Sequence, residues 1–301
     1  MILATLVALA LAAEPATVVT IDPSHRLVEG VATDGATIFV SSVLDRQILA
    51  CTRSCRTIAT LPEGFHPLGI AFDWGRKLLW IAADCPEVVG IAKCDRGALF
   101  AINRSGKWRG RFVPAQGSFH PGDVFASQSG IFVSDSQNGL VWSLIPRKPG
   151  LRMVNRPGDG KSAQGTTLSP SGVELIVADY ARGIGRIDLK TKATTWLPRQ
   201  DGKPSVGIDG LVRCGTSYVG VYNGGAAPAR IWQFRVRPGG VDRSELVDGL
   251  TLVDPTQIAF DGKKLLLVSD SGWERTGKGE ATRQTGARIL AIPLGKDCKA
   301  R

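Results

Sequence analysis

Several motifs that identify an enzyme class are missing from this sequence. It contains no C-x-x-C pair, and its three histidines lie away from its six cysteines along the chain, which argues against a zinc site built on cysteine. Gly160-Lys161-Ser162 is not a phosphate-binding loop, because Asn155 stands where that motif needs glycine. No G-x-S-x-G nucleophile elbow is present. These absences remove P-loop nucleotide binding and the serine-elbow hydrolases from the candidate functions.

Helical periodicity is also missing. No stretch repeats apolar residues at a sustained 3.6-residue period, which argues against a helical solenoid. The 36 glycines and 17 prolines are spread along all 301 residues and favour a fold with many turns. Since 43% of the residues are hydrophobic, the chain can bury a substantial core. We therefore predict an all-β protein.

The chain has no apolar run of the roughly 20 residues that a membrane-spanning helix needs. Its first segment, Met1–Ala13, is apolar and ends in small residues, which is typical of a secretory signal peptide, although a positively charged start is missing. An uncleaved anchor is the alternative. The six cysteines also fit export. We expect a periplasmic or secreted protein with no stable membrane insertion once the signal is cleaved.

The net charge is +10, yet no strongly basic run accompanies it. The basic residues are scattered, with mild clusters at 104–111 and 147–156. Arg109 and Arg111 alternate with apolar positions, as on the solvent face of an outer strand, and aromatic residues nearby raise nucleic-acid binding as an alternative. A strand edge protected by charge is the favoured interpretation. We expect no nucleic-acid partner.

One pattern recurs through the chain. In Leu27–Ser42, a short inner strand (Val28–Ala32) is followed by a turn and an apolar strand (Thr37–Ser42). Five further copies follow at intervals of roughly 40–55 residues, a period typical of β-propeller blades. The residues that open the six copies are Glu29, Leu68, Gly122, Gln164, Asp209 and Thr256. In a closed ring these positions converge on one axis.

The ends of the chain predict how the ring closes. A third strand follows in every copy and a fourth in copies one to five, for example Thr57–Leu61. The sixth copy has no chain left for a fourth strand, and Thr17–Ile21 can supply it, which removes two exposed sheet edges. We therefore predict a six-bladed β-propeller over residues 14–301, as a single domain whose last blade is completed by an N-terminal strand.

The cysteines allow 15 pairings in principle. In the predicted topology Cys51 and Cys55 flank the turn between the third and fourth strands of blade one. Cys85 and Cys94 lie within an insertion in blade two. The remaining pair, Cys214 and Cys298, follows two strands that run in the same direction. We predict disulfides between the members of these three pairs.

Two connections between second and third strands are long, at Asp84–Gly97 in blade two and at Ser271–Gly286 in blade six. Such loops lie on the face where the inner strands begin. Blades two and six are the ring neighbours of blade one, so both insertions border Glu29. Long loops on a rigid scaffold are common carriers of function.

Four segments resemble a known family: Leu27–Gly30, His66–Asp73, Gln164–Gly172 and Ile208–Leu211. They are similar to segments of the senescence-marker-protein/gluconolactonase/luciferin-regenerating-enzyme-like family of six-bladed propellers, to which paraoxonases and strictosidine synthases are more distant relatives. The resemblance covers nearly the whole chain after the signal segment, as weak repeats. It implies a hydrolase that opens lactones or related ring esters with a divalent cation on the central axis.

The resemblance also implies the ligands of that cation. The family's glutamate in the first blade corresponds to Glu29, and its aspartate in a D-G-L setting corresponds to Asp209. The usual asparagine of an N-G motif is Gln164 here. The asparagine of the third blade is Gly122, which leaves Asp123 as the acidic partner. Carboxylate and amide oxygens suit Ca²⁺ first, with Mg²⁺ or Zn²⁺ as alternatives.

The same positions suggest catalytic roles. Glu29 and Asp209 are candidate bases toward a water or a lactone, and His66 is a candidate acid or base. Each could instead be a structural residue, with the acids hydrogen-bonded to channel water and His66 packed beside the following proline. Five more side chains are candidates for the substrate pocket: Asn223, Tyr222, Tyr180, Trp273 and His120.

Two functions of different class remain. The first is an exported, monomeric, gluconolactonase-like hydrolase that acts on a small-molecule lactone or ester with a divalent cation on the axis. The alternative is a non-catalytic propeller that binds a small ligand or a protein partner through the face carrying the insertions.

Overall fold

The computed structural model describes residues 15–86, 91–92, 94–145, 150–247, 252–276, 286–294 and 298. The predicted signal segment, 1–13, and most of the predicted insertion at 271–286 lie outside these residues. Strands dominate the described part, which has one short α-helix, α1 (Trp273–Thr276). None of its helices has the length and apolar character needed to cross a membrane.

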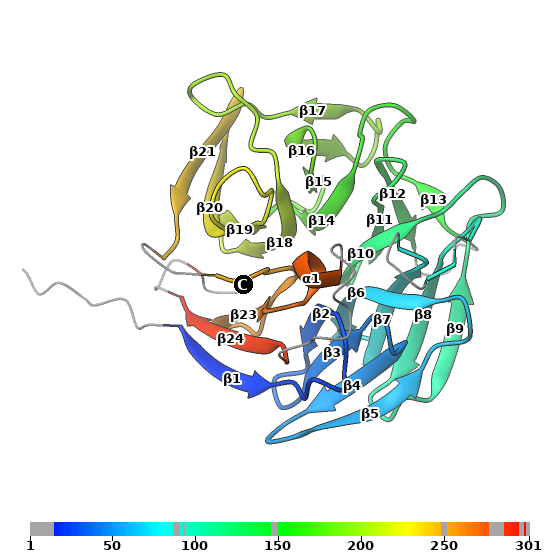
Figure 1. Cartoon of the computed structure of the whole chain (residues 1–301). Coiled ribbons are helices and arrows are strands. Elements are labelled where there is room, and N and C mark those ends of the chain that lie inside the picture. Colours follow the sequence, from blue (N-terminus) through cyan, green and yellow to red (C-terminus); the bar gives the residue numbers. More distant parts are fainter. Residues whose placement is uncertain are drawn as a thin grey trace, which may run out of the picture.

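Six antiparallel sheets of four strands stand around a central axis, as predicted (Figure 1). Blade one consists of β2 (Val28–Thr33), β3 (Ile38–Ser42), β4 (Gln47–Cys51) and β5 (Cys55–Thr60). Blade two consists of β6 (His66–Asp73), β7 (Leu78–Asp84), β8 (Ala98–Asn103) and β9 (Trp108–Phe112). Blade three consists of β10 (Pro121–Ser127), β11 (Gly130–Asp135), β12 (Leu140–Leu144) and β13 (Arg152–Met153).

The next two blades repeat the same order. Blade four consists of β14 (Ala163–Leu168), β15 (Glu174–Asp179), β16 (Gly183–Asp188) and β17 (Thr194–Trp196). Blade five consists of β18 (Ile208–Cys214), β19 (Ser217–Tyr222), β20 (Arg230–Arg237) and β21 (Gly240–Glu245). In each of the first five blades the chain therefore runs from the axis outward, one strand after another.

Blade six closes the ring with both ends of the chain. Its strands from the axis outward are β22 (Ile258–Phe260), β23 (Lys264–Ser269), β24 (Arg288–Pro293) and β1 (Ala16–Thr20). Ala16 pairs with Ala291 and Thr20 with Arg288, and Ile21 N donates to Ala287 O at 2.8 Å. The predicted closing strand is confirmed and begins one residue earlier than expected.

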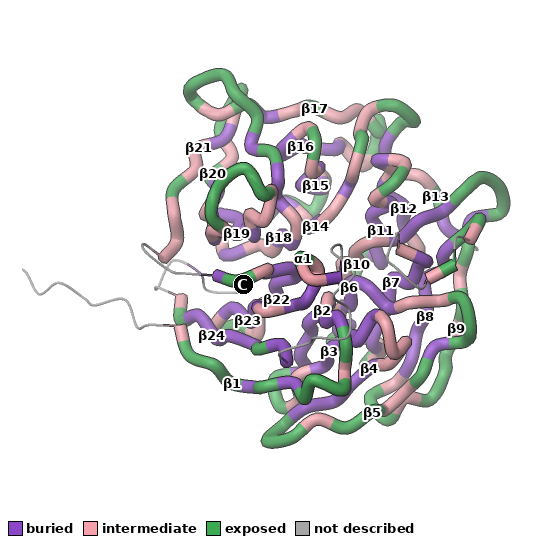
Figure 2. The backbone as a smooth tube through the Cα atoms, viewed as in Figure 1, coloured by how far each residue is buried: buried purple, intermediate pink, exposed green. Residues whose placement is uncertain are grey.

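The core lies between the blades. Six apolar clusters fill the spaces between neighbouring blades, including the space between the last and the first. In that closing space Val19 and Ile21 of the N-terminal segment pack with Val31 and Val40 of blade one. Buried residues follow the inner three strands of blades one and two, while no residue of their outer strands β5 and β9 is buried (Figure 2). Burial of apolar side chains between blades thus holds the ring closed.

All three predicted disulfides are present. Cys51–Cys55 closes the turn between β4 and β5, and Cys85–Cys94 crosses the blade-two insertion. Cys214–Cys298 joins the end of β18 to the chain beyond β24, inside the apolar cluster between blades five and six. Three disulfides are typical of an oxidising, extracellular compartment.

Candidate functional site

The inner strands are irregular at the positions that carry the predicted site residues. The pairing register shifts between Val28 and Val31 in β2, between Ala163 and Thr166 in β14, and between Ile208 and Leu211 in β18. These shifts contain the three openings Glu29, Gln164 and Asp209. A β-bulge re-aims a side chain that would otherwise alternate with the pleat. The bulges therefore turn these polar groups toward the axis.

A glycine follows each of these three residues, and the close packing around the axis requires it. A Cβ added at Gly165 would lie 2.2 Å from the backbone nitrogen of Leu211 in the next blade. A Cβ at Gly30 would lie 2.5 Å from the carbonyl oxygen of Leu68. Only glycine allows neighbouring inner strands to approach so closely. The X-Gly pairs in the sequence thus have a packing reason.

A cavity of about 1080 Å³ opens at this end of the axis. Six of the predicted site residues line it: Glu29, Gln164, Tyr180, Asp209, Asn223 and Trp273. Pro86 of the blade-two insertion and Glu274 of α1 reach the same cavity, and α1 lies over the centre of the ring (Figure 1). Both insertions therefore border Glu29, as their positions in the repeat predict.

Glu29 lies deep in the ring, with its carboxylate toward the cavity. Trp273 Nε1 donates a hydrogen bond to Glu29 Oε2. Among the described residues no salt bridge reaches this carboxylate, and Arg230, which lines the same cavity, is paired with Glu245 at 3.0 Å. Burial raises the pKa of Glu29 well above its usual range, and the neighbouring carboxylates, Asp209 first, raise it further. A positive charge placed in the cavity would therefore be strongly favoured.

Asp209 and Asn223 form the second polar group of the cavity. Asn223 Nδ2 donates to Asp209 Oδ2 at 2.8 Å and to the carbonyl oxygen of Pro255 at 2.8 Å. This leaves Asn223 Oδ1 buried without a hydrogen-bond partner among the described residues. Burial raises the pKa of Asp209 to about 6, with Asp254 as a further acidic neighbour. Asp254, in the loop before β22, also lines the cavity and was not predicted from the sequence.

Asp123 is hydrogen-bonded to Gln257 and does not line the cavity that contains Glu29. Gln257 Nε2 donates to Asp123 Oδ1, while Gln257 Oε1 accepts from Val31 N at 2.8 Å and from Ile70 N at 3.1 Å. Asp123 and Gln257 line a second cavity, of about 840 Å³, and not the one that contains Glu29. Burial raises the pKa of Asp123 to about 7. The repeat pattern did not predict Gln257 as a site residue, because the pattern places the site residue of blade six at the opening position, which is Thr256.

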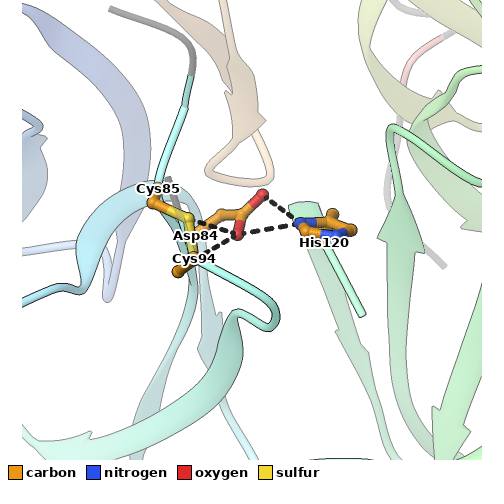
Figure 3. Close-up of a disulfide and its surroundings, with 4 residues drawn as sticks. All are labelled: Asp84, Cys85, Cys94 and His120. Atoms are coloured by element: carbon orange, nitrogen blue, oxygen red, sulfur yellow. Dashed lines mark hydrogen bonds and ion pairs between the residues drawn. A yellow bond between two sulfur atoms is a disulfide. The ribbon is translucent and has the colours of Figure 1, made fainter. Parts of the chain in front are cut away.

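The remaining predicted site residues lie elsewhere. His66 Nδ1 is hydrogen-bonded to the carbonyl oxygen of Val43 at 2.8 Å. Burial lowers the pKa of His66. The ring of Tyr222 packs beside Gly207. His120 faces Asp84 and lines a separate cavity beside Cys85 and Cys94. None of these three side chains lines the central cavity. His120 is distant from Cys85 and Cys94 along the chain, but the ring places it at the same cavity as these two cysteines (Figure 3).

The central donor set fits a hard divalent cation. Glu29 and Asp209 supply carboxylate oxygens, and the unpartnered oxygen of Asn223 supplies an amide ligand. Gln164 and Gly122 depart from the family pattern together. A Cβ added at Gly122 would lie 3.5 Å from Gln164 Oε1, so the longer glutamine side chain reaches the space that the missing side chain leaves. The residues present therefore suit a cation held by oxygen atoms.

Fold and cavity together define a six-bladed β-propeller with acidic side chains on its axis. No protein-family model matches the sequence, and a comparison with curated proteins finds no match. Solved structures do match. A provisionally assigned gluconolactonase superposes with a TM-score of 0.61 at 15% identity, covering 95% of this chain and 95% of that one. A gluconolactonase from Xanthomonas campestris superposes with a TM-score of 0.60 at 14% identity, covering 94% and 98%.

A solved structure of a protein with another activity is similar to nearly the same extent. The PQQ-bound aldose sugar dehydrogenase from Streptomyces coelicolor superposes with a TM-score of 0.58 at 14% identity, covering 93% of this chain and 98% of that one. Likeness at such low identity shows the fold. The presence of gluconolactonases among these neighbours agrees with the sequence resemblance, while the reaction depends on this chain's own residues.

Proposed function

We propose that the protein is an exported, gluconolactonase-like hydrolase that opens a lactone or a related ester with a divalent cation, Ca²⁺ first, on the propeller axis. One observation carries the proposal: Glu29 and Asp209 face one cavity without a cationic partner among the described residues, beside the unpartnered oxygen of Asn223. Buried carboxylates in this state are costly unless a cation balances them.

Glu29, Asp209 and Asn223, with Gln164 nearby, would hold the cation. When bound, it supplies Lewis-acid polarisation of a ring-ester carbonyl and lowers the pKa of a bound water. Asp209, beside the cation, is the candidate group to accept a proton from the attacking water. Tyr180 and Trp273 offer ring surfaces for a substrate. The product is a hydroxy acid.

The test combines metal analysis with a panel of sugar and aliphatic lactones. We expect the purified protein to contain one equivalent of a divalent cation, to lose activity on chelation and to regain it with Ca²⁺ or Mg²⁺. Glu29→Gln and Asp209→Asn should each abolish turnover and cation-dependent thermal stabilisation. The matched control is Glu274→Gln, an exposed glutamate at the rim of the same cavity, which should behave as the wild type.

Unchanged cation binding and turnover in both axis variants would refute the proposal. Cation-free protein with no lactone turnover would favour the alternative, a propeller that binds a ligand or partner through the same face. That alternative predicts that deletion of 271–286 abolishes ligand or partner capture.

A further inference from the structure

A second cavity, of about 840 Å³, is lined by all six inner strands of the propeller. In the first five blades its lining residues come later along the strand than those of the cavity that contains Glu29. In β2, for example, Glu29 lines the first cavity and residues 31–33 line the second. The volume lies within the range of small-molecule sites, about 300–1,000 Å³. The hydrolysis proposed above makes no use of this second cavity.

Asp123 is the one acidic residue that lines the second cavity in the described part of the chain. Its Oδ1 accepts hydrogen bonds from Val124 N at 2.7 Å and from Gln257 Nε2. Its Oδ2 has no hydrogen-bond partner among the described residues. A Cβ added at Gly69, on the neighbouring inner strand, would overlap Asp123 Oδ1, so the glycine makes room for this carboxylate. The cavity therefore contains an acid with one oxygen available to a ligand.

The atoms around Asp123 suit an ammonium group better than a divalent metal ion. The two groups bonded to Asp123, Val124 N and Gln257 Nε2, are donors, which repel a metal ion. Gln257 Oε1 already accepts from two backbone N–H groups and is not available as a ligand. An ion such as Ca²⁺ takes about six to eight oxygen ligands, whereas an ammonium group needs only acceptors for its three N–H donors. Asp209 adds a negative field that favours a cation at Asp123.

Most of the other side chains that line this cavity are apolar, and four of them are aromatic: Phe72, Trp74, Phe125 and Phe260. The rings of Phe72 and Trp74 lie edge to face, with their centroids 5.4 Å apart, and Trp74 is 48% exposed. Aromatic faces attract organic cations and also pack against apolar bodies. The cavity therefore combines one carboxylate oxygen with an apolar, aromatic wall.

Arg213 is the one cationic residue that lines the second cavity in the described part of the chain. It lies near the end of β18, whereas Asp123 lies near the beginning of β10. Because the inner strands run in the same direction and rise about 3.3 Å per residue, the two residues stand at different depths of the cavity. No salt bridge joins them among the described residues. The charge of Asp123 is therefore left for a ligand.

We propose that the second cavity binds a small organic ammonium ion with an apolar body, whose N–H donates to Asp123 Oδ2 while the body packs against the aromatic wall. The binding is non-covalent, and Glu29 of the first cavity takes no part in it. The site is therefore independent of the proposed hydrolysis and of any cation on the axis.

Isothermal titration calorimetry in the presence of a chelator tests the proposal with three probes of the same body. These are 4-phenylbutylamine, 4-phenylbutanol and 4-phenylbutyrate, which differ in the charge of one end. Wild type should bind the amine at one site and at least about tenfold more tightly than the alcohol, because a hydrogen bond between charged groups is among the stronger ones. The carboxylate should bind no better than the alcohol. Equal affinity for amine and alcohol, tighter binding of the carboxylate, or no binding of the amine in the millimolar range would overturn the proposal.

Asp123→Asn locates the site, because asparagine can keep both hydrogen bonds at Oδ1 while it places a donor in the position of Oδ2. This variant should lose the preference for the amine over the alcohol. Glu29→Gln, in the first cavity, and Arg213→Gln, in the second, are the matched controls and should keep that preference. A preference that persists in Asp123→Asn, or that disappears in either control, would overturn the proposal. If Asp123→Asn does not fold, the comparison of the three probes on the wild type still decides.

Discussion

Trp273 donates its indole N–H to the carboxylate of Glu29, although 244 residues separate them. Glu29 lies in the bulge of β2 in the first blade, and Trp273 begins α1 in the last blade. The contact exists because the N-terminal strand and the last three strands share one sheet, which brings blades six and one together. Closure of the ring thus also completes the environment of the acid at its centre.

The first prediction concerns this bond. Trp273→Phe keeps an aromatic ring but removes the donor, so the ionised form of Glu29 loses stabilisation. We expect a loss of about 1–3 kcal/mol in the free energy of unfolding at pH 9, where Glu29 is more ionised, and a smaller loss at pH 5. Urea unfolding at the two pH values measures the difference. Trp108→Phe, at a side chain on β9 that is 42% exposed, should change stability by less than about 0.5 kcal/mol. Equal losses at both pH values in Trp273→Phe would indicate ring packing instead.

The second prediction is a fall in stability with rising pH in protein freed of cations by a chelator. The folded-state pKa values of Asp209, about 6, and Asp123, about 7, lie above the ordinary 3.8. Between roughly pH 4 and 7 the folded state therefore binds more protons than the unfolded state, and stability decreases as pH rises. The pKa shifts correspond to a loss of up to about 3 kcal/mol for Asp209 and about 4 kcal/mol for Asp123 across this range. Asp209→Asn should flatten the profile measured by urea unfolding, whereas Glu274→Gln should not. A profile in Asp209→Asn as steep as that of the wild type would contradict this assignment.

The third prediction tests the hydrogen bonds that Gln257 makes to neighbouring inner strands. Gln257→Leu is close in volume but leaves the backbone N–H groups of Val31 and Ile70 without their acceptor. Unsatisfied buried donors cost about 1–3 kcal/mol each, so we expect a loss of about 2–5 kcal/mol in chemical denaturation. Gln200→Leu is the matched control, because Gln200 makes one exposed hydrogen bond to Asp242. Similar losses in both variants would show that Gln257 has no special structural role.

The fourth prediction tests ring closure by the N-terminal segment. Ile21 is fully buried between blades six and one, whereas Val18 in β1 is 36% exposed. Ile21→Ala should lower the free energy of unfolding by about 2–5 kcal/mol. Val18→Ala should change it by less than about 0.5 kcal/mol. Should Ile21→Ala prove as stable as Val18→Ala in urea, the N-terminal segment would not hold the ring together.

Most of the fold could be predicted because each blade is encoded by a short sequence pattern that repeats along the chain. Each blade needs only a short inner strand, a turn and an apolar strand, and these signals lie within a few residues of one another. The closing strand could be predicted because the C-terminal part of the chain supplies only three strands of blade six, and the segment before Asp22 has a strand pattern that can supply the fourth. The disulfides followed from the same topology, since Cys214 ends the first strand of blade five and Cys298 follows the third strand of blade six, and first and third strands run in the same direction.

The site was less predictable, because it depends on which of the two cavities each side chain lines. Asp123 stands at an inner strand like Glu29, yet it is hydrogen-bonded to Gln257 and lines the second cavity. No local signal marks Gln257, whose three partners lie on other blades. His66 and His120 occur in the same Phe-His-Pro setting, but one is bonded to a backbone carbonyl and the other faces Asp84.

The sequence by itself determined the six repeats, the closure by the N-terminal strand, the disulfide pairs and the acids at the mouths of the first and fifth inner strands, because all of these depend on local pattern and strand order. Only the tertiary structure decided which polar groups meet. Bulges turn Glu29 and Asp209 into one cavity, and Gln257 bonds Asp123, which lines another. The packing of blade three against blade two brings His120 to Asp84, beside Cys85 and Cys94. These contacts depend on distances between blades, which no spacing along the chain encodes.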